Sequence, residues 1–314
     1  MLDFFNTPSQ YGAAEIFEFR GGTGAAGSSP LPQVWSKPRG KSMCHILLLG
    51  GGGNGGTGVI GAVSTAAGGG GGGSGGQSSL MIPLHMLPDT LFISLPFSGQ
   101  GSVGTPTATV SIIPITTTGA YTVLYAATGS NGGNASGATA GSAGGAASAA
   151  NIANCCLAGI GTYNFLPGQA GIIGGTTSAG GAISFPTTGL IVTGGTGGAG
   201  LPASGSGLAG GAFTNPGGIS PFPIHVGGLG TASATTPPGN GESGLQYFNQ
   251  FKYFTGGTGG GSTFATATGA GLAQSSGGNG APGCGGGGVG GALTASTAGV
   301  VGKGGEGYCI ITCW

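Results

Sequence analysis

Long glycine-rich tracts are the feature that most constrains what this chain can fold into. Of its 314 residues, 81 are glycine. Turns need only one or two glycines, so the tracts are too long to be turns. Glycine loses more conformational freedom on folding than any other residue, so a fold that orders the tracts must offset a large entropy loss. The tracts are Gly50–Gly58, Gly68–Gly76, Gly194–Gly200, Gly256–Gly261 and Gly277–Gly291.

The rest of the composition indicates whether the chain is ordered or disordered. Glycine and the 18 prolines make up nearly a third of the chain, which by itself is also typical of low-complexity disorder. Disordered chains are usually polar and charged, however. Here 38% of residues are apolar, only 4% are charged and the mean hydropathy is +0.30. A neutral, apolar chain would aggregate if it stayed unfolded, so we expect an ordered structure.

A polyglycine-II-like core would order such tracts. A strict Gly-X-Y triplet is absent, so the chain is not collagen. Left-handed chains with three residues per turn can pack side by side where glycine removes the Cβ atom, with backbone N–H and C=O groups bonded between neighbours. Each net hydrogen bond contributes only about 0.5–1.5 kcal/mol, so many chains must lie in register.

Short apolar runs alternate with these tracts and predict β-strands. They are four to seven residues long, rich in β-branched and aromatic residues, and bounded by Gly, Pro or Asn. Their continuous apolarity predicts strands covered on both faces. The sequence therefore predicts an all-β chain in which short strands clamp the glycine-rich core, with very little helix and residues 146–157 as the best exception. The runs are Cys44–Leu49, Leu91–Leu95, Thr109–Ile115, Tyr121–Ala127, Leu190–Thr193 and Tyr308–Cys313.

The first 41 residues differ from the rest of the chain, because they hold more than half of the charged residues and many aromatics. We divide the chain into an N-terminal arm, 1–41, and a glycine-rich body, 42–314. The arm is either an ordinary N-terminal strand pair or a docking arm that attaches the chain to a larger assembly. The candidate docking residues are Phe4, Phe5, Tyr11, Phe17, Phe19, Arg20 and Trp35.

A second candidate site is the aromatic segment Gln246–Phe254. Its aromatic rings gather around one lysine, which favours a ligand platform or a subunit contact that uses stacking, suited to sugars or protein partners. The alternative is a local hydrophobic plug under a loop. The candidate residues are Tyr247, Phe248, Phe251, Lys252, Tyr253 and Phe254.

Several function classes are disfavoured. The formal net charge is zero with six Lys and Arg residues, which cannot build a phosphate-neutralising surface, so no nucleic-acid partner is expected. No run of 18 apolar residues predicts a membrane span, and the N-terminus does not resemble a secretory signal. The six cysteines lack paired spacing and are expected to be free and buried, without a metal site or cofactor.

Catalytic groupings are equally sparse, so we expect the chain not to be an enzyme. The few acidic residues are scattered, and the weakest alternative is a carbohydrate-active enzyme, which would bring two carboxylates within about 10 Å of each other in a groove. Repeated Gly-x-Gly-x-x-Gly matches carry no weight in a chain with this much glycine.

Several stretches resemble glycine-rich virion proteins of phages. Trp35–Gly40, followed by Met43–Leu49 and a glycine tract, is similar to the opening of that group. Pro88–Leu91 and the ending Val301–Trp314 are similar to its later and closing strands. The group includes tail-fibre tip adhesins, which fold their glycine tracts into a polyglycine-II sandwich whose end loops contact the host receptor.

The resemblance implies a non-catalytic structural protein of the virion surface, tail-fibre or tail-associated, and host adhesion if it sits at a tail tip. Other virion proteins, further copies of the chain and a host receptor, either a glycan or an outer-membrane protein, are the implied partners. Longer Ala/Ser/Thr-rich connections and a more elaborate N-terminal arm depart from the tip adhesins, so a capsid decoration or fibre protein stays open. A secreted glycine-rich extracellular or ice-binding protein is the alternative of another class.

Overall fold

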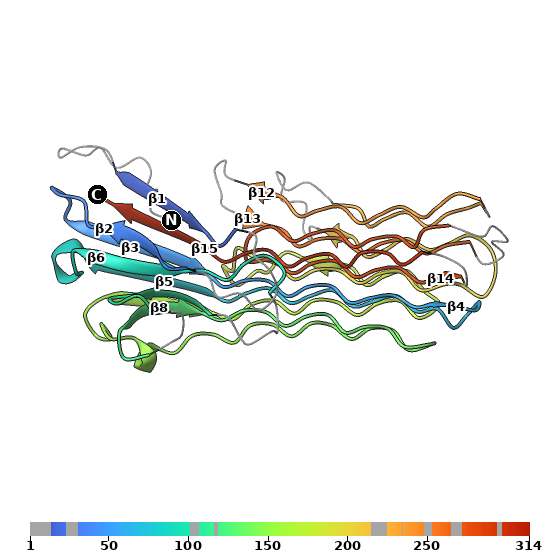
Figure 1. Cartoon of the computed structure of the whole chain (residues 1–314), viewed down its shortest axis with the longest axis horizontal. Helices are drawn as coiled ribbons and strands as arrows, with labels where there is room; N and C mark the ends of the chain where they lie inside the picture. Colours follow the sequence, from blue (N-terminus) through green and yellow to red (C-terminus); the bar gives the residue numbers. More distant parts are fainter. Residues whose placement is uncertain are drawn as a thin grey trace.

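The computed structural model is an elongated molecule with β-sheets at one end and glycine-rich segments running along the rest (Figure 1). It describes residues 14–22, 31–100, 107–115, 119–214, 225–233, 235–247, 253–264, 272–293 and 297–314. The structure is 26% strand and 2% helix, which confirms an all-β chain with very little helix.

Two antiparallel sheets form what we call the sheet end. The five-stranded sheet has the order β1-β15-β3-β5-β9 and the four-stranded sheet the order β2-β6-β7-β8. The first contains β1 (Glu15–Arg20), β15 (Tyr308–Cys313), β3 (Met43–Leu49), β5 (Gln77–Pro83) and β9 (Thr162–Leu166). The second contains β2 (Gln33–Ser36), β6 (Thr90–Ser94), β7 (Ala108–Ser111) and β8 (Thr122–Ala126).

The two sheets share one hydrophobic core. Leu48 and Ile311 from the first sheet and Leu91 and Val110 from the second are fully buried in the same cluster. Along β3, buried residues alternate with half-buried ones, as expected where only one face of a strand lies against the core. The expectation that this strand is covered on both faces is therefore wrong, whereas every residue of β15 is buried.

Only short elements lie outside these sheets. Residues 146–157 contain no α-helix, because Asn151 caps a single 3-10 turn, Ile152–Asn154, and Cys155 returns to an extended conformation. Leu190–Thr193 is not a strand either, although Val192 forms a single bridge with Phe254. The other elements are a 3-10 turn at Leu84–Met86 and the strands β4 (Ile60–Gly61), β10 (Ile183–Ser184), β11 (Phe213–Thr214), β12 (Gln246–Tyr247), β13 (Tyr253–Phe254) and β14 (Ala292–Leu293).

The glycine tracts are buried and bonded main chain to main chain. Along Gly68–Gly76, successive amides donate in rotation to segments 169–175, 283–289 and 127–133. The carbonyls of the same tract accept from three other segments, 50–56, 141–147 and 195–198. A rotation of three residues is what a polyglycine-II-like chain with three residues per turn would give. We call the glycine-rich segments joined in this way, between Gly50 and Gly307, the glycine lattice.

Close approach of the backbones explains why these positions are glycine. A Cβ atom on Gly71 would overlap the carbonyl group of Gly195, and one on Gly72 would overlap that of Gly53. The lattice therefore excludes side chains at these positions, although small ones such as those of Ser74 and Thr196 are buried elsewhere in it.

Asparagine side chains complete the bonding at the edge of the lattice. The Oδ1 atom of Asn134 accepts a hydrogen bond from the Thr57 amide at 2.9 Å, and that of Asn279 accepts one from the Lys303 amide at 2.9 Å. Outer segments lack neighbours on one side, so these amides would otherwise be left to solvent.

Candidate binding surfaces

The segments of the lattice run back and forth, so their turns gather at its two ends. Gly50 pairs with Gly76 next to the sheets, whereas Val59 pairs with Ala67 farther along the lattice. In Figure 1, β4 and β14 accordingly lie at the end opposite the five-stranded sheet. We call the turns at this far end the distal turns. Their described residues fall within 60–66, 135–140, 176–179, 202–208, 232–240 and 293–300.

The distal turns present mostly small, uncharged side chains, although Val300 is an exposed apolar residue among them. They contain no charged residue and consist mostly of Ala, Ser, Thr and Gly. Ser136 and Thr139 exchange backbone hydrogen bonds of 3.0 Å across a turn in which Gly137 has a φ of 57°. Thr177 and Ser204 are exposed. Short hydroxyl side chains on tight turns lose little conformational entropy when they meet a partner, which favours contact by shape and hydrogen bonds.

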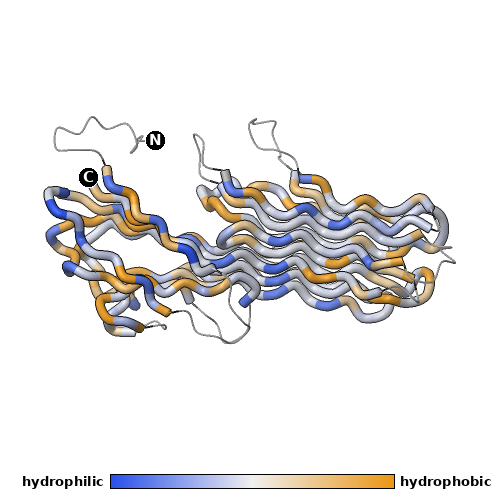
Figure 2. The backbone as a smooth tube through the Cα atoms, turned by 45° about the horizontal axis from the view of Figure 1, so that its top comes forward, coloured by the Kyte–Doolittle hydropathy of each residue, from blue (hydrophilic) through white to orange (hydrophobic). Residues whose placement is uncertain are grey.

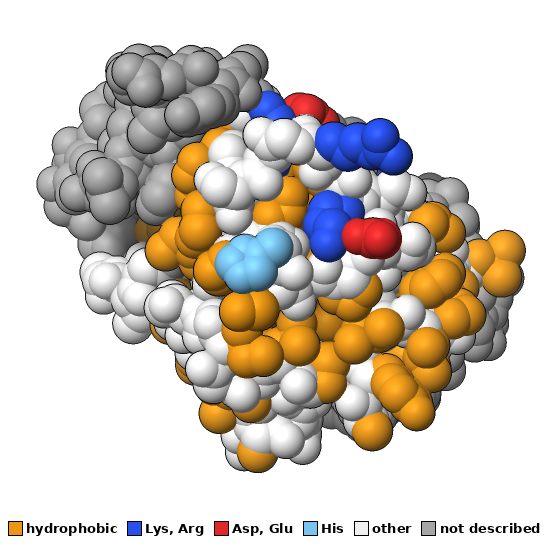
Figure 3. All heavy atoms as spheres, turned by 90° about the vertical axis from the view of Figure 1, so that its left-hand side faces the viewer, with side chains coloured by type: hydrophobic (Ala, Val, Ile, Leu, Met, Phe, Trp, Pro, Cys, Tyr) orange, Lys and Arg blue, Asp and Glu red, His pale blue; other side chains and the backbone are white. Residues whose placement is uncertain are grey.

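The sheet end has the opposite chemistry. Seen end on, it carries charged groups along one side and apolar side chains over much of the rest (Figure 3). The Nζ atom of Lys37 lies 2.9 Å from Oδ1 of Asp89, and that of Lys41 lies 3.7 Å from Oε1 of Glu15. The apolar residues most exposed in the loops at this end are Met86, Ile113, Tyr121, Ile152 and Ile160.

The described part of segment 1–41 is built into the sheets. Phe17 and Phe19 on β1 pack against the core, and Trp35 on β2 is only 1% exposed, with its ring edge-on to Phe17 at 6.1 Å. Of the other candidate docking residues, Phe4, Phe5 and Tyr11 lie outside the described residues.

Arg20 joins the N-terminal strand to other parts of the molecule. Its Nη2 atom donates to Glu18 at 2.7 Å and to Oε1 of Gln246 at 3.0 Å. Its guanidinium also lies over the Tyr308 ring, 5.4 Å from the centroid. Arg20 therefore links β1 to the β12–β13 hairpin and to the C-terminal strand.

The aromatic segment divides between core and surface. Phe254 is fully buried and its ring lies 5.4 Å from that of Tyr308, as expected of a hydrophobic plug. Tyr253 is half-buried against Phe185, at a centroid distance of 4.6 Å. The backbone of Tyr247 pairs with Tyr253 in the hairpin. Phe248, Phe251 and Lys252 lie outside the described residues.

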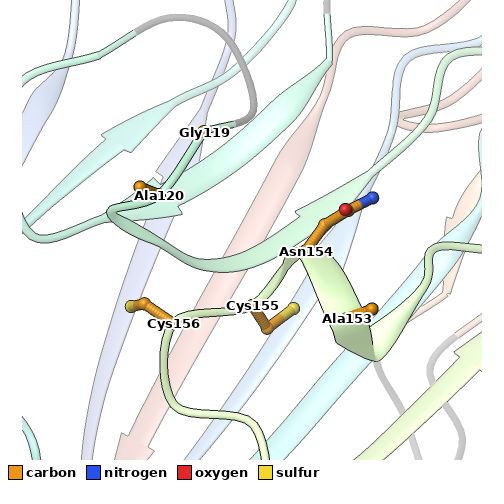
Figure 4. Close-up of a pocket in the computed structure, with 6 residues that line it drawn as sticks. All are labelled: Gly119, Ala120, Ala153, Asn154, Cys155 and Cys156. Atoms are coloured by element: carbon orange, nitrogen blue, oxygen red, sulfur yellow. The ribbon is translucent and has the colours of Figure 1, made fainter.

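One cavity, of about 370 Å³, lies near the sheet end (Figure 4). Burial raises the pKa of the Cys155 thiol to about 11 and also raises that of Cys156. Both thiols are therefore protonated near neutral pH, where the thiolate is needed for nucleophilic attack. Among the described residues that line the cavity there is neither a histidine nor a carboxylate, so these residues include no nucleophile–base pair. Its lining residues are Gly119, Ala120, Ala153, Asn154, Cys155 and Cys156.

The remaining chemistry is equally sparse. All six cysteines are free thiols, but Cys156 is exposed, so the expectation that every thiol is buried is wrong for that residue. Among the described residues, no group of three or more His, Cys, Asp or Glu could hold a metal ion. None of the helical segments that the structure describes has the length and apolarity to span a membrane.

Sequence reasoning did not single out the distal turns as a surface. The only local signal is that Ala/Ser/Thr-rich stretches follow and precede glycine tracts.

Comparison with known proteins assigns the chain to no family, because no protein-family model matches the chain and no curated protein matches its sequence.

Proposed function

We propose that the chain is a non-catalytic structural protein of a virion surface, associated with the tail, that attaches by its sheet end and holds its distal turns toward the host cell. The observation that carries this proposal is the chemical difference between the two ends of an elongated body. Ion pairs and several exposed large apolar side chains lie at one end, whereas the distal turns carry no charge and consist mostly of small residues, with Val300 as an exposed apolar exception.

The sheet end suits attachment to other virion proteins. Large apolar side chains supply most of the binding energy of stable protein interfaces, and charged groups around them fix the orientation of the partner. Tyr121 and Ile160, which are 52% and 48% exposed, are side chains of this kind. Their exposure at the same end as ion pairs such as Lys37–Asp89 supports an interface at this end.

The structure of the lattice favours a role as a stiff spacer between the two ends of the molecule. Every residue of Gly68–Gly76 is bonded to a neighbouring segment, so bending the lattice would break bonds in several segments together. The distal turns are thereby held at a fixed distance from the sheet end. Their small hydroxyl side chains favour contact with a host glycan or an outer-membrane protein, without the aromatic stacking that the segment Gln246–Phe254 would offer.

Particles purified from the source of this sequence test the location. Mass spectrometry should detect the chain, and gold-labelled antibodies against the purified protein should decorate the tail. Label confined to the capsid would instead establish the decoration alternative. Absence of the chain from purified particles would contradict the proposal.

Adsorption measurements test the distal turns. The purified protein should compete with particles for adsorption to host cells. The double variant Thr177→Lys with Ser204→Lys, which places charge on two distal turns, should lose this competition at least tenfold. A matched variant, Ala146→Lys, changes an exposed residue on the side of the lattice and should compete like the unmodified protein. Equal competition by all three proteins would exclude these turns as the contact surface.

A further inference from the structure

Cys44 and Cys313 lie directly opposite each other in the antiparallel pairing of β3 with β15. The next pair along, Met43 and Trp314, exchanges both backbone hydrogen bonds, at 3.0 and 3.2 Å. Hydrogen-bonded and non-hydrogen-bonded pairs alternate in an antiparallel ladder, so the two cysteines form a non-hydrogen-bonded pair, with Cα atoms about 4.5 Å apart. Disulfides span Cα distances of about 4.4–6.8 Å, so a bridge here requires no movement of the strands.

The two side chains point into the same core. Both residues are fully buried in the hydrophobic cluster between the sheets. Their thiols share a hydrogen bond, which lowers the pKa of Cys313 and, together with burial, raises that of Cys44. Cys313 is therefore the thiol that ionises first, and Cys44 is the neighbour placed to react with it.

Position along the strands distinguishes this pair from the other buried thiols. Cys44 is the second residue of β3 and Cys313 is the last residue of β15, so the pair lies at the end of the ladder. Ladder ends open more readily than ladder centres, which gives a small oxidant access. Cys309 is also fully buried on β15, but it faces Leu48 and has no cysteine opposite it.

We propose that Cys44 and Cys313 form an intramolecular disulfide when the protein meets a small-molecule disulfide such as oxidised glutathione. The Cys313 thiolate attacks one sulfur of the oxidant, forming a mixed disulfide and releasing one glutathione thiolate. Cys44 loses its proton and attacks Sγ of Cys313, forming the protein disulfide and releasing the second glutathione. The two cysteines lose two electrons, and these reduce one glutathione disulfide to two thiols.

The bridge would close nearly the whole chain into one loop, because it links a strand near the start of the sheets with the C-terminal strand. Such a loop restricts the unfolded chain, so the oxidised protein should be more stable than the reduced one. This inference does not depend on the proposed function, although a protein released from a reducing cytoplasm would meet the oxidant outside the cell.

The test uses the full chain carrying Cys156→Ser, which removes the exposed thiol and with it intermolecular bridges. After incubation with oxidised glutathione and alkylation of the remaining thiols, peptide mapping should find Cys44 linked to Cys313. The melting temperature should rise by about 5–10 °C relative to the reduced protein. Adding Cys44→Ser should abolish both effects, whereas the matched variant with Cys309→Ser should keep both.

Two results would overturn the proposal. One is that Cys44 and Cys313 remain fully alkylatable or carry only glutathione after prolonged oxidation of the folded protein. The other is that Cys309→Ser prevents the bridge as completely as Cys44→Ser does.

Discussion

The sheet end and the glycine lattice each have a buried interior, but one is filled by side chains and the other mostly by backbone. The sheet end is filled by large side chains such as Leu48 and Leu91, which exclude water by their apolar surface. The lattice interior is filled mostly by backbone, as the contacts of Gly71 and Gly72 show, and amide-to-carbonyl hydrogen bonds join its segments. The two interiors therefore fail in different ways: the sheet end is weakened when a side chain is cut back, and the lattice when a side chain is added.

Figure 2 shows the same contrast along the backbone. Hydrophilic and hydrophobic residues recur along the lattice segments, and strongly hydrophobic stretches mark the sheets. Local hydropathy therefore does not separate the inside of the lattice from its outside. What separates the inside of the lattice from its outside is the position of each residue in the three-residue repeat of hydrogen-bond partners.

The largest effect is expected from adding one methyl group to the lattice interior. Gly71→Ala would place a Cβ atom against the Gly195 carbonyl, where the atoms that must move belong to backbone bonded on several sides. We expect a loss of about 4 kcal/mol or more in the free energy of unfolding, measured by denaturant titration. The control Gly61→Ala meets only side-chain atoms at 3.4 Å and should change stability little. Equal stability of the two variants would contradict a close-packed lattice.

Removing volume from the sheet end should have the next largest effect. Leu48→Ala deletes a fully buried side chain and should cost about 3 kcal/mol of unfolding free energy, through lost apolar burial and the cavity that remains. Val34→Ala, on a side chain that is 58% exposed, is the matched control and should cost well under about 1 kcal/mol. A Leu48→Ala protein as stable as this control would show that the sheets do not contribute a packed core.

Asparagine side chains at the lattice edge should contribute less. Asn279→Ala removes the oxygen that accepts the Lys303 amide and should cost about 1 kcal/mol. Asn279→Asp keeps an accepting oxygen at this position and should retain most of that stability near neutral pH. The two variants are compared by their denaturation midpoints, and an alanine variant as stable as the aspartate one would argue against this role.

The smallest effect concerns pH at the surface of the sheet end. The ammonium group of Lys37 donates to Asp89 and lowers the pKa of that carboxyl below its usual 3.8. Since the folded-state pKa is the lower one, the contribution to stability is present above pH 3.8 and is lost as the pH falls through the folded-state pKa. NMR titration of Asp89 should show its pKa rising in Lys37→Met and unchanged in Lys41→Met. An unchanged pKa in Lys37→Met would contradict the pairing.

Much of the fold could be predicted, because its strands carry local signals. The runs beginning at Cys44, Leu91 and Tyr308 correspond to β3, β6 and β15 within about a residue at each end. The strand β5 was missed because it begins with polar residues. In the structure, Oε1 of Gln77 accepts from the Ile191 amide at 3.0 Å and Ser78 donates to the Tyr125 carbonyl at 2.6 Å, partners that no local pattern reveals.

The candidate sites were harder to predict than the strands. Trp35 and Phe254, which the sequence offered as binding residues, are fully or nearly fully buried. An aromatic residue in a short apolar run is as compatible with a core as with a binding surface, so the sequence alone does not distinguish the two. The distal turns become a surface only when the pairing of distant segments, such as Val59 with Ala67, is known. Such long-range pairings are not encoded in the composition of any one tract.

Amide hydrogen exchange along Gly68–Gly76 tests most directly whether bare backbone serves as a solid interior. Each of these amides donates to a neighbouring segment, so their exchange should be as slow as that of the amides of β3 in the middle of the five-stranded sheet. Exchange of this tract at the rate of an unstructured glycine peptide, with β3 still protected, would contradict the lattice.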